Sequence, residues 1–226
     1  MLFNMAWRNI HLKTGRAATR GAVGFFIAVA LLLASGAALA QSSSESGAVL
    51  LVAAPNLVDA SYYHTVIIAA PVEGDRHIGL IVNRPMRRTL ASLFPDHGPS
   101  KAVAEPVFFG GPMSRTAVFA LAKGVAANGA GSLKILPDLS LAINVNVVDK
   151  LIEEWPNDSR YYVGNVVWQP GELYQEIRRG VWNVMNADPA VVFSKNPEQL
   201  WEKLSKMARG TMADASGLAA NLPELH

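Results

Sequence analysis

From Val49 onward, short apolar runs rich in β-branched residues alternate with turns that contain proline, glycine or aspartate. This pattern predicts β-strands. Several runs are continuous rather than alternating, which indicates strands that are buried on both faces. The predicted strands span Val49–Ala54, Thr65–Ala70, His77–Asn83, Val107–Phe109, Ala117–Ala122, Leu133–Leu136, Leu141–Val145, Tyr161–Trp168 and Val191–Phe193.

Helix signals appear mainly in the second half of the chain. Asn146 is a candidate N-cap for a helix over Val147–Trp155, which Pro156 would end. A shorter helix is predicted from Pro170 to Arg179, before Gly180. Strands first and helices mostly later, without regular βαβ alternation, favour an α+β fold over a doubly wound sheet.

A last helix is predicted after Asn196. The run Asn196-Pro197-Glu198-Gln199 has the pattern of a capping box with proline at the first helical position. The apolar positions that follow recur with the helical period, so they would form one buried face: Leu200, Trp201, Leu204 and Met207.

The first forty residues differ from the rest of the chain. Four basic residues precede an apolar run from Ala22 to Ala34, and Ala38-Leu39-Ala40 places small residues two apart before Gln41. This arrangement predicts a secretory signal over residues 1–40, cleaved near Gln41. The alternative is an uncleaved membrane anchor, because residues 21–40 approach the length that crosses a bilayer.

The basic residues before the apolar run favour a cytoplasmic N-terminus, so either form would carry the remainder across the inner membrane. We therefore expect a periplasmic protein whose only membrane contact is its N-terminal segment. An inner-membrane form is one alternative, and a cytoplasmic form is another if translation starts downstream. Residues 41–47 are predicted to be a flexible tether, residues 48–210 a single domain, and residues 211–226 a flexible tail.

Composition excludes several classes of protein. The leader holds four of the 20 basic residues and none of the 18 acidic residues, so the remainder has slightly more acidic than basic residues. A clustered basic face, which is typical of nucleic-acid binding, is therefore not expected. The absence of cysteine excludes disulfides, thiol catalysis and cysteine-ligated metal.

Three segments carry the most specific motifs: Gly-Leu-Ile-Val-Asn-Arg-Pro at 79–85, Phe-Phe-Gly-Gly-Pro-Met at 108–113, and Trp-Gln-Pro-Gly-Glu-Leu at 168–173. Glu176, Gly180 and Trp182 follow the third. In order and spacing these motifs resemble the YqgE/AlgH family (UPF0301, DUF179), from about Gly47 to about Met207. The resemblance implies a mixed, branched β-sheet curled into a pseudo-barrel with helices packed outside, and no established molecular activity.

The chain departs from the family pattern in places. Ala60 stands where the opening turn of the family has proline, and Glu172 and Tyr174 replace a glutamine and a glutamate of the third motif. If that corner binds a ligand in relatives, its charge is altered here. The leader is also unlike typical members of the family, which look like soluble cytoplasmic proteins.

Two motifs supply candidate ligand-binding residues. Asn83 and Arg84 end an apolar strand, and the Arg84 guanidinium could bind a carboxylate or phosphate through two donors. Gly110 and Gly111 follow another strand, where consecutive amides can form an anion-binding nest. A tight structural turn is the simpler interpretation of these glycines, since no lysine or helix follows in P-loop spacing.

Trp168 and Glu172 complete the candidate set. Glu172 and Glu176 lie four apart, so they share a helix face and could act as paired carboxylates. Because arginines follow at once, a solvated face is the simpler interpretation. The remaining candidate ligands have no recognised metal-ligand spacing, so we expect no metal and no cofactor: His64, Asp75, His77, Asp96 and His97.

The leading hypothesis is a non-enzymatic, exported binding or regulatory protein. Its surface around Asn83-Arg84-Pro85, Gly110-Gly111-Pro112 and Trp168–Glu172 would meet a protein partner or a small anion. A small-molecule hydrolase is the alternative, with Glu172 or Glu176 as base and Arg84 as anion clamp, although the chain has no Gly-x-Ser-x-Gly elbow. A transcriptional regulator, the family's historical label, fits poorly because no helix-turn-helix signal is present.

Overall fold

The computed structural model describes residues 47–124 and 130–209. The predicted leader and tail, and all but the last residue of the predicted tether, lie outside the described residues. Within the described ranges, no helix has the length and apolar character needed to cross a membrane.

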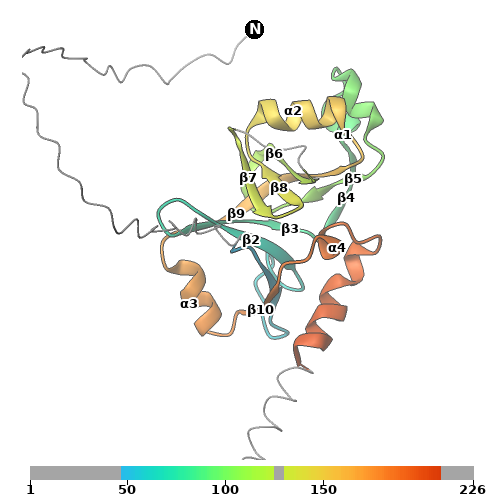
Figure 1. Cartoon of the computed structure of the whole chain (residues 1–226). Coiled ribbons are helices and arrows are strands. Elements are labelled where there is room, and N and C mark those ends of the chain that lie inside the picture. The colour runs from blue at the N-terminus through green and yellow to red at the C-terminus, as the bar shows by residue number, and fades with distance from the viewer. Residues whose placement is uncertain (1–46, 125–129, 210–226) are drawn as a thin grey trace, which may run out of the picture. The chain divides into compact units, whose positions relative to one another are not determined.

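Ten strands among the described residues form one mixed sheet, with the order β10-β1-β2-β3-β9-β6-β8-β7 and with β4 and β5 off this path (Figure 1). Most pairs are antiparallel, whereas β5 and β9 run parallel. The strands are β1 Val49–Ala53, β2 Val66–Val72, β3 Arg76–Ile81, β4 Pro85–Thr89, β5 Pro106–Phe109, β6 Met113–Lys123, β7 Ser132–Leu136, β8 Leu139–Ala142, β9 Ser159–Trp168 and β10 Trp182–Asn186.

The sheet branches at β9, its central strand. Along one edge of β9, Tyr162 pairs with Phe108 of β5, whereas Trp168 farther along pairs with His77 of β3. The opposite edge pairs with β6. Gly164, at φ +76°, lies where β5 gives way to β3, so the strand can bend there at no cost from a Cβ. The sheet therefore curls around this point, which confirms the predicted α+β class and branched, curled sheet.

Helices cover the outside of this sheet. α2 (Val145–Glu154) lies against β6 and β8, and α3 (Glu172–Arg178) packs near β10. A further helix over residues 200–209 follows the 3-10 turn η2 (Pro197–Gln199). The shorter segments are α1 (Leu90–Leu93), the 3-10 helix η1 (Gly98–Ala102) and α4 (Pro189–Val192).

The core lies on both faces of the sheet, as the continuous apolar runs predict. Along β1, Leu50 and Val52 face one hydrophobic cluster, whereas Leu51 and Ala53 face another. This division follows from the two-residue period of a strand. The first cluster contains Leu200 and Leu204 of the C-terminal helix, the second contains residues of α3, and a third cluster forms under α2.

Several local predictions were wrong. Val191–Phe193 is not a strand, because the Asp188 side chain accepts a hydrogen bond from Ala190 N and Pro189 begins α4. The N-cap of α2 is Asn144, whose Oδ1 accepts from the Asn146 amide, so the helix starts at Val145 and the preceding strand β8 ends at Ala142. Asn196 makes no side-chain capping bond, and the chain enters its last helix through η2.

Candidate functional site

The predicted residues Asn83 and Arg84 lie just past the end of β3, where they hold the loop that precedes β2. Arg84 donates from Nη1 to the Ser61 carbonyl at 2.7 Å and from Nη2 to the Tyr63 carbonyl at 2.9 Å. Its guanidinium also lies 5.4 Å from the centre of the Tyr63 ring. Burial lowers the pKa of Arg84 from its ordinary value, yet an arginine stays charged in a protein.

Asn83 is buried and holds the same loop. Its Oδ1 accepts from Val66 N at 2.8 Å, and its Nδ2 donates to the His64 carbonyl at 2.9 Å. Both ends of the amide are therefore bonded to backbone. We conclude that Asn83 positions the loop around His64.

His64 connects this loop to the C-terminal helix. Its backbone is in the left-handed region at φ +54°, which is uncommon for a residue other than glycine. The imidazole stacks on Trp201, with the ring centres 3.7 Å apart and the planes 24° from parallel. Trp201 in turn donates from Nε1 to the Ala53 carbonyl at 2.8 Å. Residues from distant parts of the chain are thus fixed around one surface.

A pocket of about 500 Å³ opens beside Arg84, and we call it the Arg84 pocket. It combines one guanidinium with an imidazole, aromatic and apolar side chains and one carboxylate. Its lining residues are Tyr63, His64, Asn83, Arg84, Pro85, Met86, Phe109 and Glu198.

A second pocket, of about 320 Å³, shares Pro85 and Glu198 with the Arg84 pocket and contains Arg160. The Arg160 side chain is only 2% exposed. It donates to both carboxylate oxygens of Glu105 and to the carbonyls of Val192 and Ser194. The charge of Arg160 is thus already paired with a carboxylate. Its bonds to the two carbonyls anchor the α4 segment to the sheet.

Gly110 and Gly111 form a tight turn against β9. A Cβ added at Gly110 would overlap the carbonyl oxygen of Gly164, and one at Gly111 would overlap that of Asn165. The Gly110 amide donates to the Val163 carbonyl at 2.8 Å, so it is not free to bind an anion. The geometry explains these glycines by the close approach of two backbones, and neither lines the Arg84 pocket.

Trp168 and Glu172 lie elsewhere. Trp168 pairs with His77 at the start of β3, whereas Arg84 follows the end of that strand, and the Trp168 side chain is 2% exposed. Glu172 accepts a hydrogen bond from the Gln169 amide at 2.8 Å, at the start of α3. The two residues are therefore separated from Asn83 and Arg84, although the sequence grouped all four.

Glu176 is bonded to two tryptophans. Its Oε2 accepts from Trp168 Nε1 at 2.8 Å and from Trp182 Nε1 at 2.7 Å. Glu172 and Glu176 thus occupy separate hydrogen-bonding sites, and neither lines the Arg84 pocket. The tryptophans supply core packing, as expected, but the link between them through a carboxylate had no signal in the sequence.

The sequence did not predict that Tyr63, Phe109 and Glu198 share a site with Arg84. Phe109 lies there because its amide donates to the Arg84 carbonyl at 2.9 Å. In the sequence, Glu198 belongs to the capping-box pattern that opens the last helix, which indicates nothing about a pocket. A sequence pattern reports local structure, so it could not show that the turn at Glu198 lies beside the loop at Tyr63.

Known proteins match this chain over most of its length. The DUF179 family model, described as AlgH-like, matches residues 50–213. A UPF0301 protein of Chlorobium luteolum is 30% identical over 189 residues, which cover 78% of this chain and 90% of the relative. The UPF0301 protein MCA0413 1 of Methylococcus capsulatus is 31% identical over 172 residues, covering 74% and 94%.

Two solved structures share the fold. The solution structure of the AlgH protein from Pseudomonas aeruginosa has a TM-score of 0.59 and 24% identity, and covers 81% of this chain and 98% of its own. The crystal structure of protein DIP2367 from Corynebacterium diphtheriae has a TM-score of 0.57 and 22% identity, with coverage of 69% and 83%.

Proposed function

This chain belongs to the AlgH-like DUF179 family, and we propose that it is a non-enzymatic binding or regulatory protein. Its Arg84 pocket recognises an anionic group, carried either by a protein partner or by a small molecule. The observation that carries the proposal is the state of Arg84: its guanidinium is fixed in place, yet no carboxylate among the described residues pairs with it.

Arg84 retains donor capacity for a ligand. A guanidinium has five N–H donors, and two of those of Arg84 are used by the carbonyls of Ser61 and Tyr63. The Nε–H and one N–H on each terminal nitrogen remain for a carboxylate or phosphate. Because the two carbonyls already fix the guanidinium, an anion would bind with little further loss of side-chain entropy.

The rest of the pocket suits an anionic group attached to an apolar or aromatic body. Tyr63 and Phe109 provide ring surface, and Met86 provides an adaptable apolar contact. Arg87 and Arg88 are exposed on the neighbouring strand β4 and add positive potential nearby. Glu198, which lines both pockets, repels ligands that place additional negative charge beside it.

The hydrolase alternative gains no specific support. A base beside Arg84 would have to come from the pocket walls, but Glu172 and Glu176 line neither of the two pockets. Glu176 would also have to give up two indole donors before it could accept a proton from a substrate. A recognition role requires no such rearrangement.

We further propose that the domain acts in the periplasm. This proposal rests on the leader predicted for residues 1–40. The absence of cysteine is compatible with an oxidising compartment but does not require one. Fractionation that finds the processed protein with cytosolic markers would contradict it without affecting the Arg84 pocket.

Calorimetric titration of the full chain, in mild detergent, would test recognition. Inorganic phosphate and a short glutamate-rich peptide with blocked ends distinguish a small anion from a partner segment. We expect Arg84→Gln to weaken binding about tenfold or more, since a charged hydrogen bond is lost. Arg76→Gln is the matched control, because Arg76 also donates to a backbone carbonyl, that of Glu73, but lines neither pocket.

Equal losses in the two variants would overturn the assigned pocket. Binding of neither probe by the wild-type chain would leave an anionic ligand without support. Steady turnover of a small ester or phosphoester, abolished by Glu172→Gln or Glu176→Gln, would replace the proposal with the hydrolase.

A further inference from the structure

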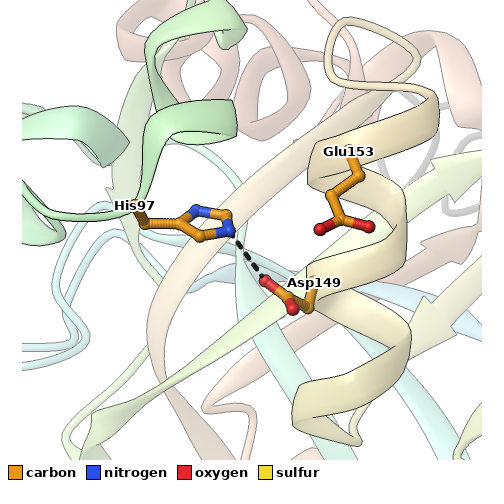
Figure 2. A group of neighbouring side chains, drawn as sticks. All are labelled: His97, Asp149 and Glu153. Carbon is orange, nitrogen blue, oxygen red and sulfur yellow. Dashed lines mark ion pairs between the residues drawn. The ribbon is translucent and has the colours of Figure 1, made fainter.

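We propose that His97, Asp149 and Glu153 form a binding site for a divalent transition-metal ion, with Zn²⁺ as the natural probe. The three side chains come from two elements: His97 immediately precedes η1, whereas Asp149 and Glu153 lie on α2. Each offers one ligand atom, and these atoms all lie within 4.8 Å of one another. Figure 2 shows the imidazole and both carboxylates directed toward the same space.

The spacing of His97 and Asp149 suits a shared ion. His97 Nε2 and Asp149 Oδ1 are 3.1 Å apart. Two ligands bound to zinc at about 2.1 Å each in tetrahedral geometry would lie about 3.4 Å from one another. The ion therefore requires only a small separation of these two atoms. Glu153 must move somewhat closer, which an exposed side chain can do by a change of rotamer.

The other ring nitrogen of His97 also has a fixed hydrogen-bond partner. His97 Nδ1 lies 2.7 Å from the hydroxyl oxygen of Ser100, and Ser100 is fully buried. A metal-bound histidine commonly donates its other ring N–H to a fixed acceptor, which orients the ring. When Nδ1–H donates to Ser100, the lone pair of Nε2 is directed at the carboxylate of Asp149, and a metal ion or a proton between the two atoms makes that contact favourable.

Charge supports the same conclusion. Asp149 and Glu153 are four residues apart on one helix face, where like charges repel. Among the described residues, Glu153 makes no ion pair, although the neighbouring Glu154 pairs with Lys150 at 3.9 Å. Two carboxylates and a neutral imidazole would balance a divalent ion. An imidazole ligand favours zinc, copper, nickel or iron over calcium or magnesium.

A site with three protein ligands leaves a coordination position open to water or to a partner. Asp149 and Glu153 are exposed, so the ion would be reachable from solvent. This site is independent of the Arg84 pocket, because none of its residues lines that pocket. Loss of either site would leave the other proposal standing.

The competing explanation is a proton in place of the metal: Nε2–H donates to Asp149, and Nδ1 accepts from Ser100. The two explanations differ in whether Zn²⁺ binds. A neutral imidazole can bind the ion at Nε2 by carrying its one proton on Nδ1, where it donates to Ser100. Calorimetric titration of the untagged full chain with Zn²⁺ measures this binding, and we expect saturable binding of one ion.

Variants identify the ligands. We expect His97→Ala and Glu153→Gln each to weaken Zn²⁺ binding about tenfold or more. The matched controls are Glu154→Gln, which makes the same change one position along the helix, and His77→Ala, which removes a histidine from β3; both should bind like the wild-type chain. Circular dichroism verifies that each variant is folded.

Three results would overturn the proposal: no Zn²⁺ binding in the micromolar range, equal binding by Glu153→Gln and Glu154→Gln, or binding that survives His97→Ala in a folded protein. The last two would show adventitious binding by other exposed carboxylates or histidines. A loss of stability in His97→Ala without any effect of Zn²⁺ would support the proton explanation.

Discussion

Arg160 and Glu105, 55 residues apart in the chain, form a two-point ion pair beneath the α4 segment, with Nε to Oε2 at 2.7 Å and Nη2 to Oε1 at 2.9 Å. The guanidinium also lies 4.5 Å from the centre of the Phe108 ring. Since the Arg160 side chain is buried, its charge has little access to water and depends on Glu105.

Glu105→Gln should therefore reduce the free energy of unfolding by about 1–2 kcal/mol. The lower part of the usual range applies because half of the Glu105 side chain is exposed. Urea denaturation measures the loss. Glu202→Gln is the control, since it breaks an exposed ion pair with Lys206 and should leave the midpoint nearly unchanged. Equal midpoints for the two variants would contradict this account of Arg160.

Glu176→Ala should be more destabilising, by about 2–4 kcal/mol, because it leaves two largely buried indole N–H groups without an acceptor. Glu176→Gln keeps an acceptor oxygen and should lose clearly less. Urea unfolding compares the two variants, and near-ultraviolet circular dichroism reports on Trp168 and Trp182. If alanine and glutamine gave the same loss, the carboxylate would not be the link between the indoles.

Trp201→Ala should detach the C-terminal helix from the sheet and cost about 3 kcal/mol. It removes the stack on His64 and the bond to the Ala53 carbonyl together. Hydrogen exchange of the amides of residues 200–209 should become much faster. Trp155→Ala, which removes a partly exposed tryptophan beyond α2, should leave that exchange as in the wild-type chain. Unchanged protection in Trp201→Ala would contradict the role of the stack.

Stability should fall in alkaline solution. Burial raises the pKa of Tyr161 to about 12 and raises that of Tyr162 well above its ordinary value. The unfolded chain loses these protons near pH 10, before the folded chain does. The contribution of these two tyrosines to the free energy of unfolding is therefore fully present below about pH 10 and is lost as the pH rises toward about 12.

The two tyrosines can be tested singly. With Tyr162→Phe, the free energy of unfolding measured in urea should decline less between pH 9 and about 11.5 than in the wild-type chain. At neutral pH the substitution should lower this free energy only slightly. The cost is small because the Tyr162 hydroxyl has no hydrogen-bond partner among the described residues. Tyr174→Phe, at an exposed position, should keep the wild-type pH dependence. Parallel curves for the two variants would refute the assignment.

The central strands could be predicted because burial on both faces produces continuous apolar runs, as in β1 and β9. Two strands at the margins of the sheet, β4 and β10, could not. β4 begins with proline and carries two exposed arginines, and β10 alternates over only five residues, so neither gives a strong local signal. At α4, the Asp188-Pro189 start signal was present in the sequence, but the β-branched residues after it favoured a strand.

The candidate site could be predicted only in part, because a sequence motif reports residues that are close along the chain. Asn83 and Arg84 are neighbours in one motif, so the sequence alone shows that they lie together. Trp168 belongs to an equally specific motif, but that motif serves the core under α3. The contacts that complete the Arg84 pocket, such as His64 on Trp201, join residues far apart in sequence and arise from the curl of the sheet.

The most direct test of anion recognition is nuclear magnetic resonance of the arginine Nε–H groups during titration with phosphate or the glutamate-rich peptide. The Nε–H of Arg84 has no acceptor among the described residues, whereas that of Arg76 donates to the Glu73 carbonyl. The account predicts a saturable shift of the Arg84 signal while the Arg76 signal stays in place. A stationary Arg84 signal, or equal shifts of both arginines, would contradict it.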